Sequence, residues 1–486
     1  MLFNSWGYIL FLVIAVLCHW ILPHKYRLFI LSAFSILFYS MWRWEFSLLM
    51  IFSACVDYVA SGQIYKTENR TTRISWLLVS LTVNLGLLVI FKYTYFIYDN
   101  IRFIGSASGQ ELPDLGIRII LPLGISFYTF QTISYTIDVY RRVIKPVNSF
   151  IVFLTYVTFW PQLIAGPILR AKEVISQLTS DRKFDINNMS AGIERIIIGL
   201  FKKIAFADNI APLVDNAFAF DPSLLNAFDV WVATFLFGFQ IYFDFSAYSD
   251  IAIGSARILG IHFPENFDWP YLALSPKDFW KRWHISLSSW VRDYLYLPLA
   301  GKPFMTESTG GITVAAETDS KGKRTNALFF TWLIMGLWHG AGWTFALWGV
   351  YHALLIFIYR EIKAADWLIE KLPGAAWALM LMLGMAAWIP FRSESLSQAA
   401  IMFSKILNPL QYTFSTRALF VTSYYLGVMT VLSAMLATYF IVKYINHQSE
   451  ILKNALVYAK IATIGFMVFF ILLYMRPVRQ FIYFQF

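Results

Sequence analysis

The chain has 486 residues, of which 58% are hydrophobic and only 14% are charged. Soluble proteins carry about 25% charged residues, so this composition excludes a chain of soluble domains and predicts a helical protein that crosses the membrane several times. The net charge of +10 does not predict nucleic-acid binding, because the basic residues lie mostly in short links between apolar segments, as membrane orientation requires.

The charge of the links predicts the orientation of the first half of the chain. The first apolar stretch, Trp6 to Leu22, lacks the basic start and cleavage site of a signal peptide, so we expect it to remain as a span. Basic links at 23–27, 66–73 and 141–145 alternate with non-basic links at 42–45 and 99–116. The positive-inside rule then predicts an N-terminus outside the cell and cytoplasmic basic links.

The apolar segment Phe150–Leu169 contains Pro161 and Pro167, which should break a spanning helix. Both of its flanks are basic, so we expect a re-entrant segment that begins and ends on the cytoplasmic side. Such backbone persists at membrane depth only if it is buried in protein or lines a cavity.

The rest of the chain completes an all-α membrane protein. Further spans are expected near 193–214, 229–260, 326–359 (broken in the middle), 374–391, 422–444 and 456–475, and Lys302–Arg324 is expected to be a flexible cytoplasmic loop. We predict roughly eleven transmembrane helices plus re-entrant helices around a central funnel or tunnel. They form one domain over residues 1–486, with a core at about 120–400 and C-terminal helices at about 401–486.

A histidine lies inside an otherwise uncharged segment. Residues 326–359 contain no Lys, Arg, Asp or Glu, yet His339 stands there between small residues. Titratable groups in hydrocarbon are costly and usually face a cavity, and histidine exchanges a proton readily near neutral pH. We therefore interpret His339 as functional, the alternative being a histidine that is hydrogen-bonded between helices.

The depth of His339 bears on the type of reaction. A helix that begins near Thr325 places His339 ~20 Å along it, well inside a ~30 Å hydrocarbon core. Gly340 and Gly342 weaken the helix immediately afterwards. A base at that depth is reached only through a channel, which suggests that donor and acceptor arrive from opposite sides.

Residues 277–297 are predicted to form one amphipathic helix at the cytoplasmic membrane face. Its apolar face consists of Trp280, Trp283, Leu287, Trp290, Tyr294 and Leu297, and its polar stripe of Lys277, Lys281, His284, Ser288 and Arg292. The cations either anchor the helix or bind the phosphates of an acyl donor while His284 faces the reacting group.

Other polar residues are interpreted as structural. Asp244 and Tyr248 are four residues apart and are expected to build a polar network that supports the cavity. Cys18 and Cys55 lie in apolar stretches and predict neither a disulfide framework nor a metal site. The HExxH, Gly-rich phosphate loop and GxSxG signatures are absent from the sequence.

Five segments, in this order, resemble the membrane-bound O-acyltransferase (MBOAT) family, and within it the bacterial alginate and peptidoglycan O-acetylation branch. They are Leu121–Gln131, Pro161–Pro167, Tyr242–Gly254, Trp280–Ser288 and Trp338–Gly340. The resemblance implies an O-acyltransferase in which His339 is the essential histidine and His284 the second one. It also implies a cytoplasmic donor, acetyl-CoA, and transfer to a hydroxyl on the far side, for exopolysaccharide or cell-wall glycan O-acetylation.

On this interpretation His339 and His284 are catalytic, and Lys281, Arg282, Trp283 and Trp338 bind the donor, with no resident cofactor. The protein is expected in the bacterial cytoplasmic (inner) membrane. Its expected partners are the lipid bilayer, the cytoplasmic donor, and either a glycan acceptor or a secreted or membrane-anchored SGNH-type acetyltransferase, but no nucleic acid.

Two alternatives remain. The teichoic acid D-alanyl transferase, a cousin with the same histidines, takes its acyl group from a carrier protein. Broken helices and buried polar groups are also typical of transporters.

Overall fold

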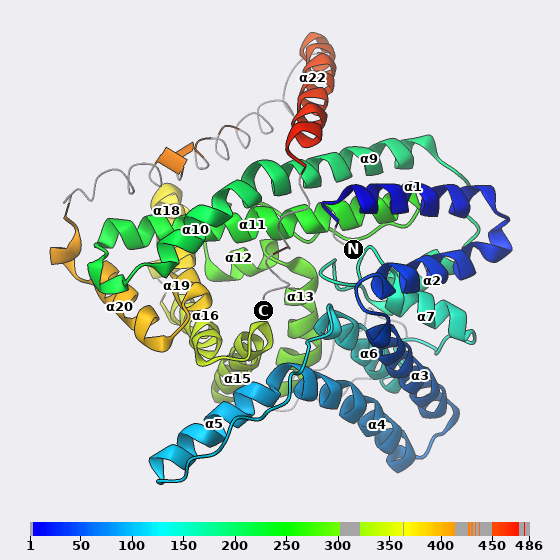
Figure 1. Cartoon of the computed structure of the whole chain (residues 1–486), viewed down its shortest axis with the longest axis horizontal. Coiled ribbons are helices and arrows are strands. Elements are labelled where there is room, and N and C mark those ends of the chain that lie inside the picture. The colour runs from blue at the N-terminus through cyan, green and yellow to red at the C-terminus, as the bar shows by residue number, and fades with distance from the viewer. Residues whose placement is uncertain are drawn as a thin grey trace.

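The computed structural model describes residues 3–301, 321–362, 364–413, 426, 427, 429, 430, 433, 437, 450–475 and 481. Within these residues every regular element is a helix, which confirms the predicted all-α class (Figure 1). Four helices there are long and apolar enough to cross a membrane, over 44–66, 70–107, 227–258 and 373–392, and shorter apolar helices cover 6–21, 396–407 and 458–474. The protein is therefore a polytopic helical membrane protein, while the count of eleven spans and the central funnel stay predictions.

The N-terminal part consists of helices joined by short turns. They are α1 (Trp6–Ile21), α2 (His24–Ser40), α3 (Trp44–Lys66), α4 (Arg70–Leu88) and α5 (Thr94–Ala107), with the π-helical turn η1 (Val89–Tyr93) joining the last two. Ser5 and Asn69 begin α1 and α4 by accepting hydrogen bonds from backbone N–H groups of the first turn. The turn η1 lies in the middle of the long helical segment 70–107, where π-helical turns often mark functional positions.

The centre of the molecule is formed by α6 (Ile125–Tyr140) and α11 (Ala227–Ile258), which are buried along most of their length. Helix α9 (Ile186–Phe201) packs along α11 with the backbones in close approach (Figure 1). A Cβ atom on Gly192 would lie 2.8 Å from the Gly254 carbonyl oxygen, and one on Gly254 would lie 2.6 Å from that of Gly192. Small residues at such a crossing are typical of membrane helix pairs.

The acidic side chains of α11 pair with cations of the adjacent helical segment. Asp244 binds Lys203 at 2.5 Å, and Asp250 binds Arg195 at 2.6 Å and Lys202 at 2.8 Å. The prediction that Asp244 forms its polar network with Tyr248 is therefore wrong, because Asp244 pairs with Lys203 instead. A buried carboxylate is stabilised far better by a neighbouring ammonium than by a phenol, and the Tyr248 ring instead packs against aromatic side chains.

The remaining elements before residue 301 are short. They are α7 (Phe150–Thr158), α8 (Ala171–Thr179), η2 (Lys202–Ala207), α10 (Asp208–Ala219), η3 (Pro222–Leu224), η4 (Pro270–Leu272), α12 (Pro276–Arg282), α13 (Ile285–Val291), η5 (Arg292–Tyr296) and α14 (Leu297–Leu299). The nine residues of α7 extend ~14 Å, too short to cross a ~30 Å core. The break predicted from Pro161 is confirmed, and the following turn is buried in protein, including Trp160 and Leu163. The sidedness of this segment remains a prediction.

The single helix predicted over 277–297 is wrong. It is interrupted at Trp283, which is extended, and at His284, which has left-handed backbone angles of φ 44° and ψ 56°. A preceding loop supplies the hydrogen bonds that the helix would otherwise make: Asp268 N–H donates to the Arg282 carbonyl and Ile285 N–H to the Asn266 carbonyl, each at 2.9 Å. The aromatic face consequently lies inside the protein, where Trp280, Trp283 and Trp290 are buried.

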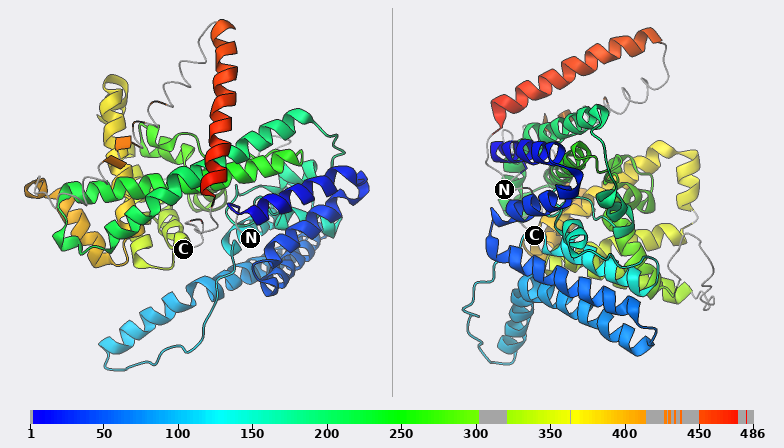
Figure 2. Two further views of the ribbon diagram at one scale, coloured as in Figure 1. Left: turned by 45° about the horizontal axis from the view of Figure 1, so that its top comes forward. Right: turned by 90° about the vertical axis from the view of Figure 1, so that its right-hand side faces the viewer.

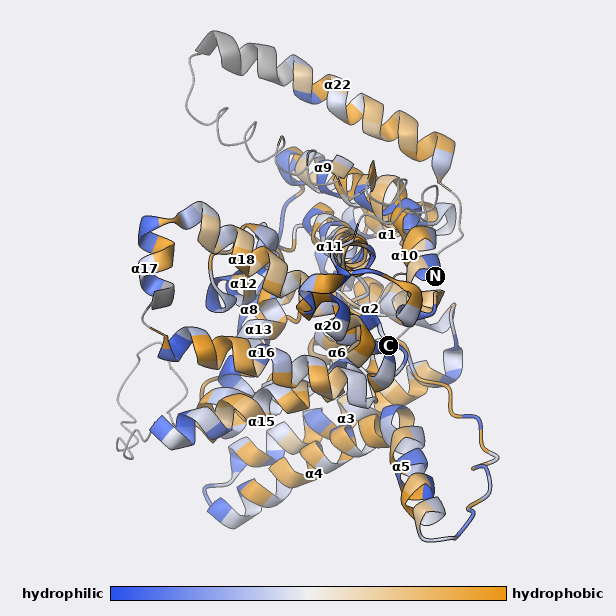
Figure 3. Ribbon diagram, turned by 90° about the vertical axis from the view of Figure 1, so that its left-hand side faces the viewer, coloured by the Kyte–Doolittle hydropathy of each residue, from blue (hydrophilic) through white to orange (hydrophobic). Residues whose placement is uncertain are grey.

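The C-terminal part contains α15 (Lys321–His339), α16 (Trp343–Glu361), α17 (Ala364–Lys371), α18 (Pro373–Ala386), α19 (Trp388–Arg392), α20 (Leu396–Leu407), η6 (Pro409–Gln411) and α22 (Glu450–Tyr474). Helix α22 is apolar over most of its length and packs against α9 at the edge of the bundle (Figures 2 and 3). The expected span at 422–444 and most of the expected loop at 302–324 lie outside the described residues.

Candidate active site

The hairpin of α15 and α16 places His339 at its apex. Helix α15 ends at His339 and α16 begins at Trp343, so the break predicted inside 326–359 is confirmed. Glycines allow the two backbones to touch: a Cβ atom on Gly336 would lie 2.2 Å from the Phe345 carbonyl oxygen, and one on Gly349 would lie 2.1 Å from that of Trp332. Because only glycine fits at such distances, the hairpin geometry depends on these two positions.

The His339 side chain is buried among aromatic rings. Its ring centroid lies 4.8 Å from those of Trp338 and Trp348 and 5.5 Å from that of Phe391. One aromatic ring links this cluster to His284: the Phe127 centroid lies 6.3 Å from that of His284 and 6.1 Å from that of Trp338. The fold therefore brings together two histidines that are 55 positions apart in the sequence.

Asn266 holds His284 in place. The His284 Nδ1 lies 3.1 Å from Asn266 Oδ1, which also accepts from the Ser286 backbone N–H at 3.2 Å and from its hydroxyl at 2.8 Å. The Asn266 amide nitrogen in turn donates to Ser249 Oγ at 3.1 Å. Since Oδ1 can only accept, Nδ1 of His284 carries a proton, and in the neutral ring Nε2 is then the basic nitrogen.

Two residues of η1 hold the end of α15. The Lys92 ammonium donates to the carbonyls of Trp338 and His339, and the Tyr93 hydroxyl donates to the Leu337 carbonyl at 2.9 Å. These are carbonyls that a helix leaves without intrahelical partners at its C-terminal end, where a positive charge is also favourable. The η1 turn thereby fixes the backbone of His339.

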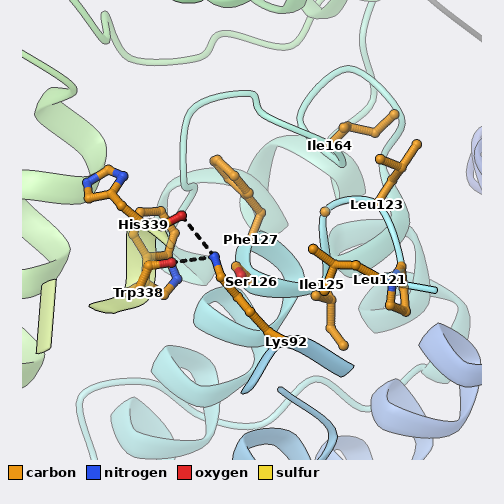
Figure 4. A pocket seen from close by; sticks show the side chains of 11 residues that line it. Lys92, Leu121, Leu123, Ile125, Ser126, Phe127, Ile164, Trp338 and His339 are labelled. Atoms are coloured by element: carbon orange, nitrogen blue, oxygen red, sulfur yellow. Dashed lines mark hydrogen bonds between the residues drawn. The ribbon is translucent and has the colours of Figure 1, made fainter. Parts of the chain in front are cut away.

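A cavity of about 80 Å³ adjoins this contact (Figure 4). It is lined by Lys92, residues 121–127, Ile164, Trp338 and His339. Gly124 closes one side in a left-handed conformation with φ 70°, and a Cβ atom there would lie 2.4 Å from the Leu163 carbonyl oxygen. In Figure 4 the His339 carbonyl faces Lys92 while the imidazole points away from it, so Lys92 contacts the backbone of His339.

Comparisons with known proteins identify the family. The sequence profile of the membrane-bound O-acyltransferase family matches residues 139–365, which include both histidines. The Azotobacter vinelandii protein named alginate O-acetylase AlgI is 35% identical over 407 residues, covering 84% of this chain and 78% of that protein. The chain belongs to the membrane-bound O-acyltransferase family. It is therefore an O-acyltransferase, and the transporter alternative is wrong.

Two further relatives of this MBOAT protein are also named as bacterial acyltransferases. The peptidoglycan O-acetyltransferase of Helicobacter pylori is 33% identical over 396 residues, covering 75% of this chain and 71% of that protein. The teichoic acid D-alanyltransferase of Bacillus subtilis is 28% identical over 272 residues, covering 54% and 65%. The MBOAT protein is thus a multi-pass membrane enzyme related to bacterial O-acetylases.

The four residues predicted to bind the donor have different environments. Lys281 is exposed at the end of α12, and Arg282 forms ion pairs with Asp278 at 2.9 Å and Asp268 at 3.7 Å. Trp283 is buried and stacks on Phe279 with a centroid separation of 5.7 Å. Trp338 lines the cavity beside His339. Among the four, Lys281 is the side chain best exposed for contact with a soluble donor.

Sequence reasoning missed Asn266 and Lys92 in this MBOAT site. Asn266 lies in a loop and has no local signal that separates it from other loop residues. Lys92 does carry a local sequence signal, because it is the only charged residue between Arg73 and Asp99, in an apolar segment. A lone cation at membrane depth is itself a reason to expect a function.

Proposed function

We propose that this membrane-bound O-acyltransferase moves an acetyl group from cytoplasmic acetyl-CoA to a hydroxyl on the extracytoplasmic side, in O-acetylation of an exopolysaccharide or cell-wall glycan. The observation that carries the proposal is the position of His339, buried at a glycine-packed break in an uncharged segment and in one aromatic cluster with a second, fixed histidine. The greater coverage of the relatives named for O-acetylation favours acetyl transfer over D-alanyl transfer.

The chemistry requires one general base. His339 accepts the proton of the acceptor hydroxyl while the hydroxyl oxygen attacks the acetyl carbonyl carbon. The tetrahedral intermediate then collapses, its carbon–sulfur bond breaks, and the thiolate leaves with the proton that His339 returns. The products are an acetyl ester and free coenzyme A. His284, oriented by Asn266, is placed to stabilise charge that develops next to His339.

Helix length supports transfer across the membrane. Helix α15 begins at Lys321, next to the loop predicted to be cytoplasmic, and its 19 residues extend ~28 Å before they end at His339. This is close to the full ~30 Å thickness of the hydrocarbon core. The donor therefore reaches His339 through protein from the cytoplasm, whereas the acceptor approaches from the opposite face.

The proposed sidedness predicts the labelling of introduced cysteines. In a variant with Cys18→Ser and Cys55→Ser, Ser108→Cys and Asp181→Cys are expected to react with a membrane-impermeant maleimide from opposite sides of sealed vesicles. Both positions are exposed, and the charge pattern places Ser108 outside and Asp181 in the cytoplasm. The cysteine-free variant sets the background. Reaction of both positions from one side contradicts the transfer across the membrane.

Donor binding predicts a selective effect of Lys281→Ala. We expect KM for acetyl-CoA to rise about 5-fold with kcat little changed, because an exposed charge pair contributes up to ~1 kcal/mol. Arg282→Ala should also lower thermal stability, since Arg282 bridges Asp268 and Asp278. Lys183→Ala, an exposed lysine outside α12, is the control. Unchanged KM with a reduced amount of protein would show that these cations are membrane anchors.

An assay of acetyl-CoA turnover distinguishes acetyl-CoA from a carrier protein as the acyl donor. Purified protein that hydrolyses acetyl-CoA or exchanges its acetyl group with labelled coenzyme A supports the proposal. Protein that is inactive toward acetyl-CoA, but that releases an acyl group from a carrier protein, supports the D-alanylation-like alternative.

A further inference from the structure

A second, smaller pocket lies where the turn between α1 and α2 meets the end of α8. Four of its lining residues can carry a positive charge, namely His19, His24, Arg27 and Arg182, and none of the described lining residues is Asp or Glu. The nearest carboxylate to these cations is that of the exposed Asp181, 3.8 Å from His24. Figure 1 shows the α1–α2 turn at the edge of the bundle, away from the α15–α16 hairpin. This basic pocket is therefore separate from the acyl-transfer site.

Neither guanidinium of the basic pocket has an acidic partner among the residues that the structure describes. Arg27 donates from Nη1 to the Arg182 carbonyl at 2.5 Å, and its Nε is buried without a hydrogen bond. Arg182 donates to the Gly260 carbonyl and, at 3.4 Å, to Gln177 Oε1. Because a charge that is withdrawn from water without a counter-ion is costly, the pocket favours an anion.

His19 is an independent indication of a ligand. Its side chain is 4% exposed and lines the basic pocket, yet neither ring nitrogen makes a hydrogen bond to another described residue. A neutral imidazole has one N–H to donate, and a protonated one has two. Buried polar groups are nearly always paired, so an unpaired imidazole at a pocket indicates that an acceptor binds there.

The size of the basic pocket limits which part of an anion it can hold. Its volume is about 20 Å³, whereas one water needs about 10–15 Å³, so one or two oxygen atoms enter and the rest of the anion stays outside. His24 and Ser180 line the pocket and are exposed, so it opens at the surface. A phosphate group fits, because its oxygen atoms match the N–H donors of a guanidinium.

The surroundings of the basic pocket indicate a lipid as the source of the phosphate. Ile21 and Phe29, each two residues from a pocket side chain, are exposed as lipid-facing residues of membrane helices are. The Arg27 guanidinium covers the Trp20 ring at 4.9 Å, and this ring packs on Phe184 with a centroid separation of 5.6 Å. Aromatic rings beside basic pockets are typical of the level of the lipid headgroups.

We propose that the basic pocket binds the phosphate group of an anionic phospholipid. Arg27 and Arg182 are its cationic ligands, and His19 donates an N–H to the oxygen atom that enters the pocket. The phosphate links α2 to the segment after α8, which lies 155 positions later in the sequence. The lipid thus supports a part of the fold away from His339, so acetyl-CoA turnover in lipid-free detergent is not expected to depend on it.

Binding of short-chain lipids to the purified protein in neutral detergent tests the pocket. Dioctanoyl phosphatidylglycerol and dioctanoylglycerol share their acyl chains, but only the first has a phosphate. Native mass spectrometry over a lipid titration should show about 10- to 100-fold tighter binding of phosphatidylglycerol, the range typical of charge-assisted hydrogen bonds. Equal affinity for the two lipids would overturn the proposal. Neither acyl donor nor acceptor is present, so the result is separate from that for the proposed function.

Inorganic phosphate is a third ligand in this titration and distinguishes the two sources of the anion. It should displace phosphatidylglycerol only at concentrations far above those at which the lipid binds, because it lacks the acyl chains. If it binds as tightly as the lipid, the occupant is a soluble phosphate and the assignment to a phospholipid is wrong.

A pair of arginine variants assigns the lipid to the basic pocket. Arg27→Gln keeps an N–H donor for the Arg182 carbonyl but removes the charge, and should lower the affinity for phosphatidylglycerol about 10-fold. Arg73→Gln is the matched control. Arg73 also donates to a backbone carbonyl, that of Tyr140, and covers its ring at 5.0 Å, but does not line the pocket. An equal effect of both variants would mean general attraction to basic residues and would contradict a specific site.

A variant at the surface tests the same pocket without removing an arginine. Ser180 is exposed, and its hydroxyl accepts a hydrogen bond from Arg182 Nε at 3.2 Å. Ser180→Glu places a carboxylate beside this guanidinium, where it competes with the phosphate, and Ser180→Gln is the uncharged control of similar size. Only Ser180→Glu should weaken the binding of phosphatidylglycerol. Unchanged affinity in Ser180→Glu would place the phosphate elsewhere.

Discussion

Replacing His339 with alanine is expected to lower the rate of acetyl transfer by about 10²–10⁴-fold, the usual contribution of a general base. The imidazole lies in a buried aromatic setting at the apex of the α15–α16 hairpin, where no other side chain of the hairpin apex can take a proton. The measurement is the turnover of labelled acetyl-CoA by purified protein, normalised to the amount of folded protein. KM for the donor should change little, because the proton transfer occurs in the transition state.

A second buried histidine provides the matched control for His339. His19 in α1 is also buried, and its ring packs on that of Trp20 with a centroid separation of 4.8 Å. His19→Gln should retain activity within a few-fold of the unmodified protein, whereas His339→Gln should not. If His339→Ala stays within a few-fold as well, the general base lies elsewhere, and His284 becomes the next candidate.

Gly336→Ala is expected to lower the free energy of unfolding by about 1–3 kcal/mol or more and to reduce activity strongly. Its Cβ atom would lie 2.2 Å from the Phe345 carbonyl oxygen and 3.1 Å from the Gly349 backbone nitrogen, so helices α15 and α16 would have to separate. Backbone atoms cannot rotate aside as the end of a side chain can. The separation would move His339, which lies one turn further along α15, relative to His284.

Gly322 provides the control on the same helix. A Cβ atom there meets nothing within 4 Å, so Gly322→Ala should leave the thermal unfolding temperature unchanged or raise it slightly. The two variants are compared by thermal unfolding in detergent and by acetyl-CoA turnover. Equal unfolding temperatures would mean that the two helices do not touch at Gly336, and the positioning of His339 would need another cause.

Local signals were sufficient for the class of the protein and for one catalytic candidate. The shortage of charged residues predicts membrane helices, because each span must be apolar over ~20 residues. Proline lacks the N–H that a helix needs, so the end of α7 before Pro161 was predictable. His339 stood out because its surroundings lack charge, and the glycines after it indicated the break that separates α15 from α16.

Other features depend on contacts between segments that are distant in the sequence. The periodicity of residues 277–297 predicts one helix, but the loop at 266–268 takes over the backbone hydrogen bonds and turns His284 inward. Lys92 acquires its role only because η1 packs against the end of α15, more than 200 residues later. Hydrophobic pattern and backbone chemistry act over one or two helical turns, so the sequence by itself determined the membrane class, the helix breaks at proline and glycine, and the choice of His339 as the candidate base. Only the tertiary structure decided which partners complete the site, because hydrogen bonds and ion pairs with distant segments outweigh local preference wherever a polar group is buried.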